Sequence, residues 1–464
     1  MNEEYEQVHQ ELLELIRKDL SRSELREKLA DYHDADIADV LSELDFEERY
    51  RVYRALGTER ISDVFSYLDD VEDFFREIGL EKSADILEEM DADDAVDILE
   101  KLPEEYREML VKRMDEDAQE DIQLITSYDD DELGSLMTTN FIVTKRGSTV
   151  KQAMKDLVSQ SDENDNISTI YVENDDGTFY GAIDLKALIR ARKDTDLEDI
   201  ITTSYPFVNA HDKISENIER LRSYSEDSIP VVDDQNHILG VITAFDVVEA
   251  VDDELGEDYA KFAGLTAEED LNESLLQSIK KRIPWLITLL ALGLVVSTVV
   301  GIFEGVVQRI ALVVSFQSLV LDMAGNGGTQ SLAVTIRVIS DETLTSKQKF
   351  GLVFKEARVG LTNGLILGSA SFLLVGLYTM IVKGLPASQA FMVSACVGIA
   401  LLIAMTISSL LGTLIPQFFN KIHIDPAVAS GPLITTVNDL IAVITYYGIV
   451  WILLLNILHM GTPV

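Results

Sequence analysis

One carboxylate stands out in the last apolar stretch of the chain, residues 422–460. Asp439 lies 14 residues beyond Asp425, which precedes a proline and can start a helix. Asp439 would then lie about 21 Å along that helix, and the stretch contains no Lys or Arg to pair with it. An unpaired acid at membrane depth is costly and commonly marks an ion path. We predict that Asp439 lines a cation pore; a structural acid held by Thr435 or Asn438 is the alternative.

A second polar stretch, Asp322–Gln330, interrupts the apolar segment 310–338. Its glycines would expose backbone carbonyls, which a membrane tolerates only against protein or a watery path. Close packing of helices against these small residues is an alternative explanation for the glycines, although not for the polar side chains beside them. Asp322 lies 15 residues before Arg337, about 22 Å by helical rise, which is close to the depth inferred for Asp439. Two acids at one level favour a cation site. The predicted pore residues in this stretch are Asp322, Gly325, Asn326, Gly328 and Gln330.

Further acids crowd two places in the first half of the chain. One group begins a predicted helix, where the helix dipole favours acids and an aspartate can cap the first turn. For this group alone, we prefer that structural explanation to a metal site. Its members are Asp91, Asp93, Asp94 and Asp97.

The other group lines a predicted long helix over residues 246–281. Spacings of three, four and seven place these acids on one face, where they repel each other unless counter-ions lie between them. A solvated linker is the alternative, but the position directly before the first apolar segment favours a cation-responsive connector. The acids are Asp246, Glu249, Asp252, Asp253, Glu254, Glu257, Asp258, Glu268, Glu269 and Asp270.

The charge of the chain is very unevenly distributed. The 464 residues carry a net charge of −43, which is the sum of −44 in residues 1–282 and +1 in the remainder. Such acidity argues against nucleic acid and anionic lipid as partners and favours divalent cations, although solubility or a saline habitat also explains part of it. The single cysteine, Cys396, excludes a disulfide framework and thiolate metal clusters. No signal peptide precedes the acidic start, so we expect the N-terminal half in the cytosol.

The sequence divides into an all-helical part and a repeated α+β part before the apolar region. Apolar residues recur at helical spacing up to about residue 128, in repeats such as Ile37–Leu41 that suggest a helical superhelix. Strand–turn–strand patterns at 170–184 and 229–243 repeat after 59 residues and resemble a tandem of CBS domains. In nucleotide-binding members, Thr243 and Asp246 would hold a ribose and a phosphate. The first copy has Asp184 where the second has Thr243, and Ala187 where the second has Asp246, so it should not bind a nucleotide in that way.

The apolar region predicts five membrane spans, at about residues 283–307, 310–338, 353–382, 387–416 and 427–459. Basic residues concentrate in the loops that a cytosolic N-terminus places inside, so the C-terminus is expected outside. An odd number of spans without an internal repeat argues against an inverted-repeat transporter.

Three motifs and the order of these parts resemble the MgtE family of magnesium channels. The motifs are Gly325-Asn326-x-Gly328-x-Gln330, Lys355-Glu356-x-x-Val359-Gly360-Leu361-x-Asn363-Gly364 and Asp425-Pro426-Ala427-x-x-Ser430-Gly431-Pro432-x-x-Thr435-Thr436-x-x-Asp439. The resemblance implies a homodimer in the lipid bilayer, with a pore between spans two and five. It places Asp439 at the selectivity site, Asp425 at the cytosolic mouth and the acids of the connecting helix on a magnesium-sensing face. Backbone oxygens of Ala427 and Gly431 would touch the water shell of the ion.

We therefore predict a multidomain membrane protein. Its parts are an acidic helical N domain (1–133), CBS domains (134–197 and 198–250), a connecting plug helix (251–282) and a five-helix transmembrane domain (283–464). The candidate metal ligands are Asp439, Asp425, Asp246, Glu249, Glu254, Glu257, Asp258, Asp91 and Asp94.

The predicted function is passive import of Mg²⁺ across the cell membrane, gated by cytosolic Mg²⁺, with ATP at the CBS domains as a second ligand. Transport of Co²⁺ or Mn²⁺ and a non-transporting CBS-bearing membrane sensor are the alternatives. We expect no enzymatic activity, since the His-Glu-x-x-His motif of a membrane metalloprotease is absent.

Overall fold

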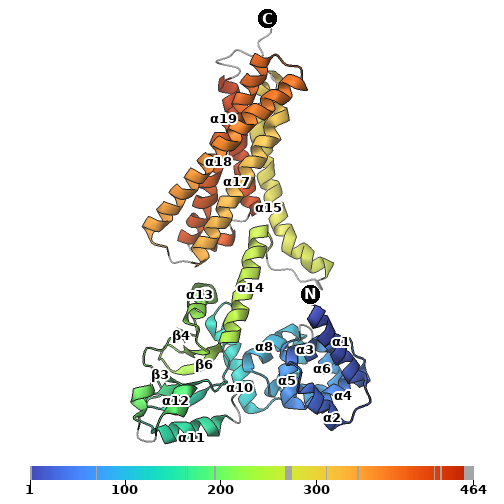
Figure 1. Ribbon diagram of the computed structural model, residues 1–464, viewed down its shortest axis with the longest axis vertical. Helices are drawn as coiled ribbons and strands as arrows, with labels where there is room; N and C mark the ends of the chain where they lie inside the picture. The colour runs from blue at the N-terminus through green and yellow to red at the C-terminus, as the bar shows by residue number, and fades with distance from the viewer. Residues whose placement is uncertain are drawn as a thin grey trace. The chain divides into compact units, whose positions relative to one another are not determined.

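The computed structural model describes the chain except for residues 1, 2, 69, 70, 162, 163, 165, 193, 194, 267–273, 310, 342, 343, 423, 429, 430 and 454–464. It divides into two compact units, Met1–Val251 and Asp252–Val464. Figure 1 shows helices followed by small sheets in the first unit and long helices in the second.

The first part of unit 1 is a succession of short helices, as the sequence predicts. The repeated pattern falls inside helices each time, and its apolar residues are buried while its aspartates face out, as in the Ile37–Leu41 repeat. Successive helices pack on one another and share one core. The helices are α1 (Glu3–Arg17), α2 (Arg22–Leu29), α3 (Asp34–Leu41), α4 (Phe46–Leu56), α5 (Thr58–Ser66), α6 (Glu72–Ile78), α7 (Leu80–Glu88), α8 (Ala92–Lys101), α9 (Glu104–Val111) and α10 (Glu116–Ile125).

Two small sheets of the same topology follow, with strand orders β1-β2-β3 and β4-β5-β6. In each, the last two strands form the predicted antiparallel hairpin and the first strand joins in parallel. A helix precedes each hairpin, α11 (Val150–Gln160) and α13 (Ile214–Tyr224). The remaining elements are η1 (Leu133–Leu136), β1 (Ile142–Lys145), β2 (Thr169–Glu173), β3 (Phe179–Asp184), α12 (Leu185–Arg190), η2 (Leu197–Ile200), β4 (Val208–Asn209), β5 (Ser228–Val232) and β6 (Ile238–Thr243).

The predicted helix over 246–281 is wrong. Helix α14 (Ala244–Ala263) ends at Gly264, whose φ of +85° only glycine adopts readily. A new helix, α15 (Leu275–Ile302), begins with a capping box at Ser274 and already contains the basic cluster Lys280–Arg282. Three predicted connector acids, Glu268, Glu269 and Asp270, lie outside the described residues.

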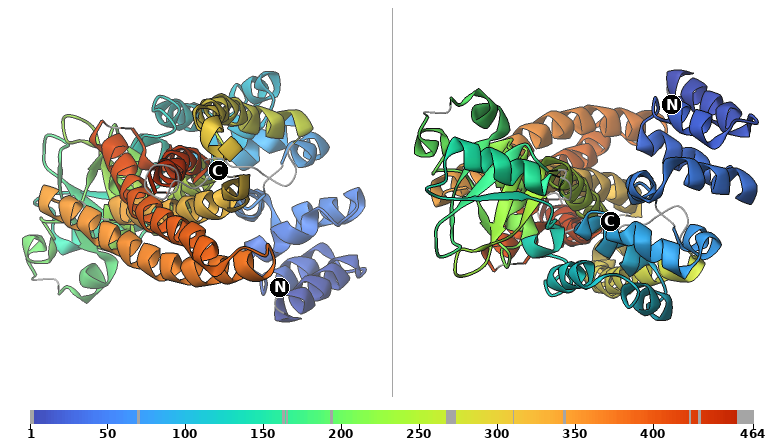
Figure 2. Two further views of the ribbon diagram at one scale, coloured as in Figure 1. Left: turned by 90° about the horizontal axis from the view of Figure 1, so that it is seen from above. Right: turned by 90° about the horizontal axis from the view of Figure 1, so that it is seen from below.

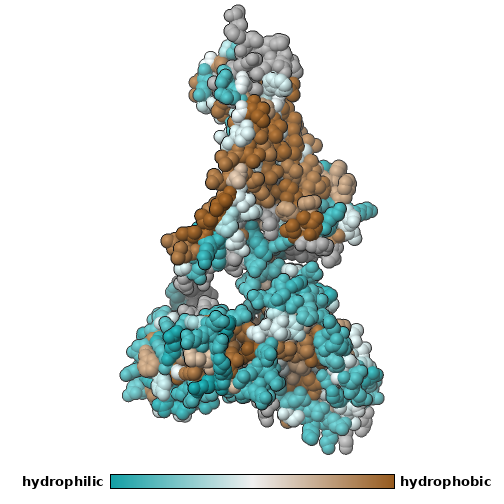
Figure 3. Space-filling model, turned by 180° about the vertical axis from the view of Figure 1, so that it is seen from behind, coloured by the Kyte–Doolittle hydropathy of each residue, from teal (hydrophilic) through white to brown (hydrophobic). Residues whose placement is uncertain are grey.

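Long helices build unit 2. Within the described residues, four of them are long and apolar enough to cross a membrane: α15, α18, α19 and α20 with its extension to Leu453. Helix α17 is equally long, but its polar stretch makes it less apolar. Helices α18 and α19 run alongside each other in Figure 2, and hydrophobic residues cover much of the helical face seen in Figure 3. The elements after α15 are α16 (Glu304–Arg309), η3 (Ala311–Val313), α17 (Val314–Asp341), α18 (Ser346–Ile381), α19 (Ala387–Lys421), η4 (Pro426–Val428) and α20 (Gly431–Val450).

The start of the last helix differs from the prediction. Asp425 does not begin it; its Oδ1 accepts a hydrogen bond from the Ala427 amide at 2.8 Å, and a 3₁₀ turn follows. Helix α20 starts only at Gly431. The 21 Å estimate for the separation of Asp425 and Asp439 assumed one continuous helix and therefore does not hold.

Candidate functional site

Helix α17 carries a polar face within unit 2. Asp322, Asn326 and Gln330 are spaced by four residues, so they share one face of the helix, and all three are exposed. Asn326 Nδ2 donates to Asp322 Oδ1 at 3.4 Å. A membrane-spanning helix could expose this face to a partner or to water, but not to lipid without cost.

Asp439 lies half-buried on α20, which packs against α17. Asp322 lies near enough for its charge to act on Asp439, so the structure brings together the two acids that the sequence placed at similar depth. The helices also meet at Thr329 and Thr435, whose hydroxyl oxygens are 3.4 Å apart. Within the described residues, Asn438 has no hydrogen-bond partner and Thr435 donates to its own helix at the Gly431 carbonyl. Neither therefore holds Asp439 in place, as the structural alternative required.

The glycines of α17 serve a different purpose from the one we predicted first. The helix continues unbroken through them, so their carbonyls stay within its own hydrogen-bonding pattern. A Cβ on Gly328 would overlap the Asn438 side chain, and one on Gly412 would overlap the Gly328 carbonyl oxygen. A Cβ on Gly325 would lie 3.4 Å from a methyl of Thr435. Close helix packing, the alternative in the sequence analysis, explains these positions.

A second group of acids gathers around the end of α14 and the 3₁₀ turn at Asp425. Glu254, Glu257 and Asp258, hereafter the connector acids, lie on α14. Burial raises the pKa of Glu254 and of Asp258, and neighbouring carboxylates raise both further. Lys261, which the sequence analysis missed, contacts two of these carboxylates. Its Nζ lies 2.7 Å from Glu257 Oε2 and 3.0 Å from Asp425 Oδ2. Only the i, i+4 spacing to Glu257 could have been read from the sequence.

A third group of acids lies inside unit 1, where the starts of α8 and α14 meet. We call it the junction cluster; its members are Asp91, Asp93, Asp94, Asp246 and Glu249. The acids that the sequence placed on one long helix over 246–281 thus divide between two sites. Asp246 and Glu249 join the acids of α8, and the connector acids lie at the other end of α14. Asp93, which was not among the predicted ligands, is the most deeply enclosed: its Oδ1 is buried without a hydrogen-bond partner.

Burial and neighbouring carboxylates raise the pKa values of three acids in the junction cluster, Asp93, Asp94 and Asp246. Burial raises the pKa of Asp93 well above its ordinary value of 3.8, and Asp246 and Asp94 raise it further. Burial followed by Asp91 raises the pKa of Asp94 to about 7. The pKa of Asp246 rises to about 6, again chiefly through burial. Ionisation of these three carboxylates is therefore unfavourable in the folded chain, and a nearby cation would favour it.

The capping explanation for the α8 acids is not supported. Asp91 occupies the N-cap position, but its side chain makes no capping hydrogen bond. Its Oδ1 instead accepts a hydrogen bond from Asn140 Nδ2 at 2.9 Å. The helix start thus lies against the segment that leads into the CBS pair.

The nucleotide motif also has a local structural role. Thr243 N donates to Asp246 Oδ2 at 2.7 Å, and Asp246 N donates to Thr243 Oγ1 at 3.3 Å, so the two residues cap α14 reciprocally. Asp246 at the same time belongs to the junction cluster.

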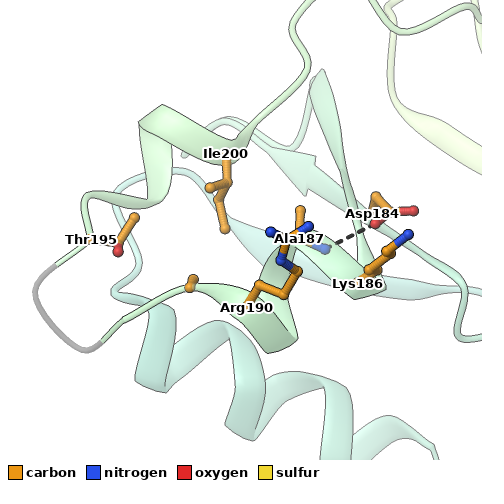
Figure 4. A pocket seen from close by; sticks show the side chains of 7 residues that line it. Asp184, Lys186, Ala187, Arg190, Thr195 and Ile200 are labelled. Carbon is orange, nitrogen blue, oxygen red and sulfur yellow. Dashed lines mark hydrogen bonds between the residues drawn. The ribbon is translucent and has the colours of Figure 1, made fainter.

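A cavity of about 540 Å³ opens in the first CBS copy, where we expected no nucleotide (Figure 4). Two cationic side chains, Lys186 and Arg190, lie at its wall, and Asp184 is held by the Ala187 amide at 2.9 Å. The lining residues are Asp184, Lys186, Ala187, Arg190, Ala191, Thr195 and Ile200.

No group of three or more His, Cys, Asp or Glu side chains in the described part of the chain has the arrangement needed to hold a metal ion. The predicted ligands lie in three groups of carboxylates: Asp439 on α20, the connector acids with Asp425, and the junction cluster.

Family models match most of the chain. A model described as a divalent cation transporter, MgtE, matches residues 317–449, the MgtE intracellular N domain matches 32–131, and CBS domains match 133–194 and 197–253.

Curated relatives are similar over similar lengths. The magnesium transporter MgtE of Enterococcus faecalis is 34% identical over 97% of this chain and 98% of its own length. The proteins of the same name from Bacillus subtilis and Thermus thermophilus are 31% and 28% identical, over 71% and 93% of this chain and 71% and 95% of their own lengths. Among solved structures, the soluble part of a magnesium transporter covers 54% of this chain and 99% of its own length, at 28% identity and a TM-score of 0.50.

Proposed function

Because the chain belongs to the MgtE family of divalent cation transporters, we propose that it is a multi-pass membrane protein that conducts Mg²⁺. The observation that carries this proposal is the meeting of Asp439 with the polar face of α17. The curated relatives are named magnesium transporters, which supports the choice of ion. Co²⁺ and Mn²⁺ remain the competing cargo.

The exposed polar face of α17 supports a homodimer. Asp322, Asn326 and Gln330 would be unfavourable against lipid, and a second copy facing them would enclose a polar path. Two Asp439 carboxylates, one from each copy, could then hold an ion that keeps most of its water shell. Mg²⁺ suits such a path, because it gives up water reluctantly and binds through one or two carboxylates.

Cytosolic Mg²⁺ is the proposed gating ligand, acting at the other two groups of acids. The connector acids face Asp425, so their mutual repulsion favours separating α14 from the 3₁₀ turn. A divalent cation between them would hold α14 against that turn. In the junction cluster, a cation would offset the burial and repulsion that raise the pKa values of Asp93, Asp94 and Asp246. Through both effects, binding of cytosolic Mg²⁺ would stabilise the compact, closed state of the protein.

Two finer assignments accompany this function. The N-terminal domains would face the cytosol and the C-terminus the outside, as the distribution of basic residues indicates. ATP would bind the CBS pair; the cations Lys186 and Arg190 at the first-copy cavity supply phosphate-binding chemistry, whereas Thr243 and Asp246 are already engaged with each other.

The test is Mg²⁺ flux into vesicles that contain the purified full-length protein. Asp439→Ala should abolish the flux and leave a folded protein, because it removes the half-buried acid from the path. Thr362→Val is a matched control, since the Thr362 hydroxyl donates only to its own helix at the Arg358 carbonyl. Wild-type flux through Asp439→Ala would remove that residue from the pore. Absence of flux in the wild type would favour a non-transporting sensor, and stronger flux of Co²⁺ or Mn²⁺ would change the cargo.

A further inference from the structure

Asn438 is a buried amide without a partner. The residue is fully buried, and neither Nδ2 nor Oδ1 has a hydrogen-bond partner in the part of the chain that the structure describes. It lies on the packed face of α20 between Ile434 and Ala442, which are also fully buried. Its amide contacts Gly328 of α17, where the absence of a side chain leaves room for it. An unpaired amide is thus enclosed where α17 and α20 cross.

Such a group destabilises the packing that contains it. Burying an amide without hydrogen bonds costs free energy, and nearly all buried polar groups in proteins avoid that cost by pairing. Thr413, fully buried on α19, does so by donating to the Ser409 carbonyl at 3.0 Å. Asn438 makes no such bond, because neither its Nδ2 nor its Oδ1 has a hydrogen-bond partner among the described residues. An apolar side chain would fill this position at lower cost.

The contact point on α17 is also the place where that helix is easiest to open. Gly325, Gly327 and Gly328 fall within four positions, and glycine is the poorest helix former after proline. Opening the helix there would release backbone N–H and C=O groups inside the membrane domain, where each needs a new partner. The Asn438 amide offers one donor group and one acceptor directly beside Gly328.

We infer that Asn438 is a positioning residue for transport: it binds backbone groups of α17 that are released when the helix opens at Gly325–Gly328 in the conducting state. In the packed state, where α17 is unbroken, the Asn438 amide has no hydrogen-bond partner among the described residues, and this raises the free energy of that state. In the opened state it is satisfied, and it fixes glycine carbonyls near Asp322 and Asp439. This inference rests on the proposed transport function, but its stability and exchange measurements do not.

The test replaces the amide by an apolar group of comparable reach, Asn438→Leu, in the full-length protein. The melting temperature in detergent should rise by about 2–4 °C, because an unsatisfied group is removed. Mg²⁺ flux in vesicles should fall at least about tenfold, because the opened state loses its partner, a loss of roughly 1.4 kcal/mol in stabilisation of that state. Hydrogen exchange of the amides at 325–329 should slow. A residue with a merely structural role would not raise stability while lowering transport.

Two further variants complete the experiment. Asn438→Val serves where leucine is too large for the crossing, and the same three changes are expected of it. Thr413→Val, which removes a buried hydroxyl that is already paired, should leave flux and exchange unchanged. A lower melting temperature in both apolar Asn438 variants would show that the amide has a partner, and unchanged flux or exchange would show that it does not serve an opened α17; either result overturns the inference. A wild type without Mg²⁺ flux would instead refute the proposed function.

Discussion

Replacing Asp94 by asparagine should stabilise unit 1 when divalent cations are absent. Asp94 lies in the first turn of α8, where the helix dipole alone would favour a negative charge and predict a loss of about 0.3–1 kcal/mol on neutralisation. The junction cluster reverses that expectation, because burial and the charges of Asp91 and Asp246 oppose ionisation. The sign of the change therefore separates the two explanations.

The magnitude follows from the pKa of Asp94, which is about 7 in the folded chain against an ordinary value of 3.8. An acid whose pKa is raised by folding holds a proton in the folded state that the unfolded chain has already lost. Stability therefore falls as pH rises through this window, and the whole cost is present above pH 7. At 1.36 kcal/mol per pH unit the cost is at most about 4 kcal/mol. Relief through Asp94→Asn should amount to roughly 2–4 kcal/mol at pH 8, and to little near pH 4.

The assay is urea unfolding of the full-length protein in detergent with EDTA, followed by circular dichroism at several pH values. Added Mg²⁺ should stabilise the wild type strongly and Asp94→Asn weakly, since the variant has lost a cation ligand. The matched control is Asp117→Asn, which neutralises an acid in the first turn of α10, outside the junction cluster. Destabilisation of both variants by similar amounts at pH 8 would refute the reasoning, because it would leave only the helix dipole.

Three further outcomes are expected. Neutralising the connector acids together, each to its amide, should leave the protein conducting at cytosolic Mg²⁺ concentrations that close the wild type; unchanged closure in flux measurements would exclude this face as the sensor. At constant ionic strength, added Mg²⁺ should slow proteolysis first at 129–134 and 246–264, whereas equal protection by excess NaCl would indicate plain screening. In thermal unfolding, Gly328→Ala should destabilise the protein by about 1–3 kcal/mol, because its Cβ would overlap the Asn438 side chain. Gly327→Ala is the control and should be tolerated, because its nearest contact would be the flexible end of Met405 at 3.4 Å.

The elements whose signal is local could be predicted from the sequence. The hairpins at 169–184 and 228–243 follow from alternating apolar residues around polar turns. The helical repeats of the N domain follow from apolar spacing. In each case the pattern and the partner that buries it lie within a few tens of residues.

Predictions that depended on distant partners fared differently. The break after α14 depends on Gly264, whose position a Cβ could not share with the Trp285 ring. The glycines of α17 pack against Asn438 and Gly412, more than 80 residues further along the chain. The missing cap at Asp91 follows from a contact with Asn140. Spacing along the sequence contains none of this information, because each outcome is decided by what folds against the segment.

Lys261 supplies only part of the positive charge that the end of α14 requires. Lys261 contacts Glu257 and Asp425, while the charges of Glu254, Glu257, Asp258 and Asp425 act on one another. The ion pairs of Lys261 are partly exposed to solvent, and such pairs contribute about 0–1 kcal/mol each. Burial, followed by neighbouring carboxylates, still raises the pKa values of Glu254 and Asp258 despite the positive charge of Lys261. At low Mg²⁺ the contact between α14 and Asp425 therefore rests on weak ion pairs. A divalent cation adds the missing charge at the same carboxylates, so closure should deepen gradually as cytosolic Mg²⁺ rises.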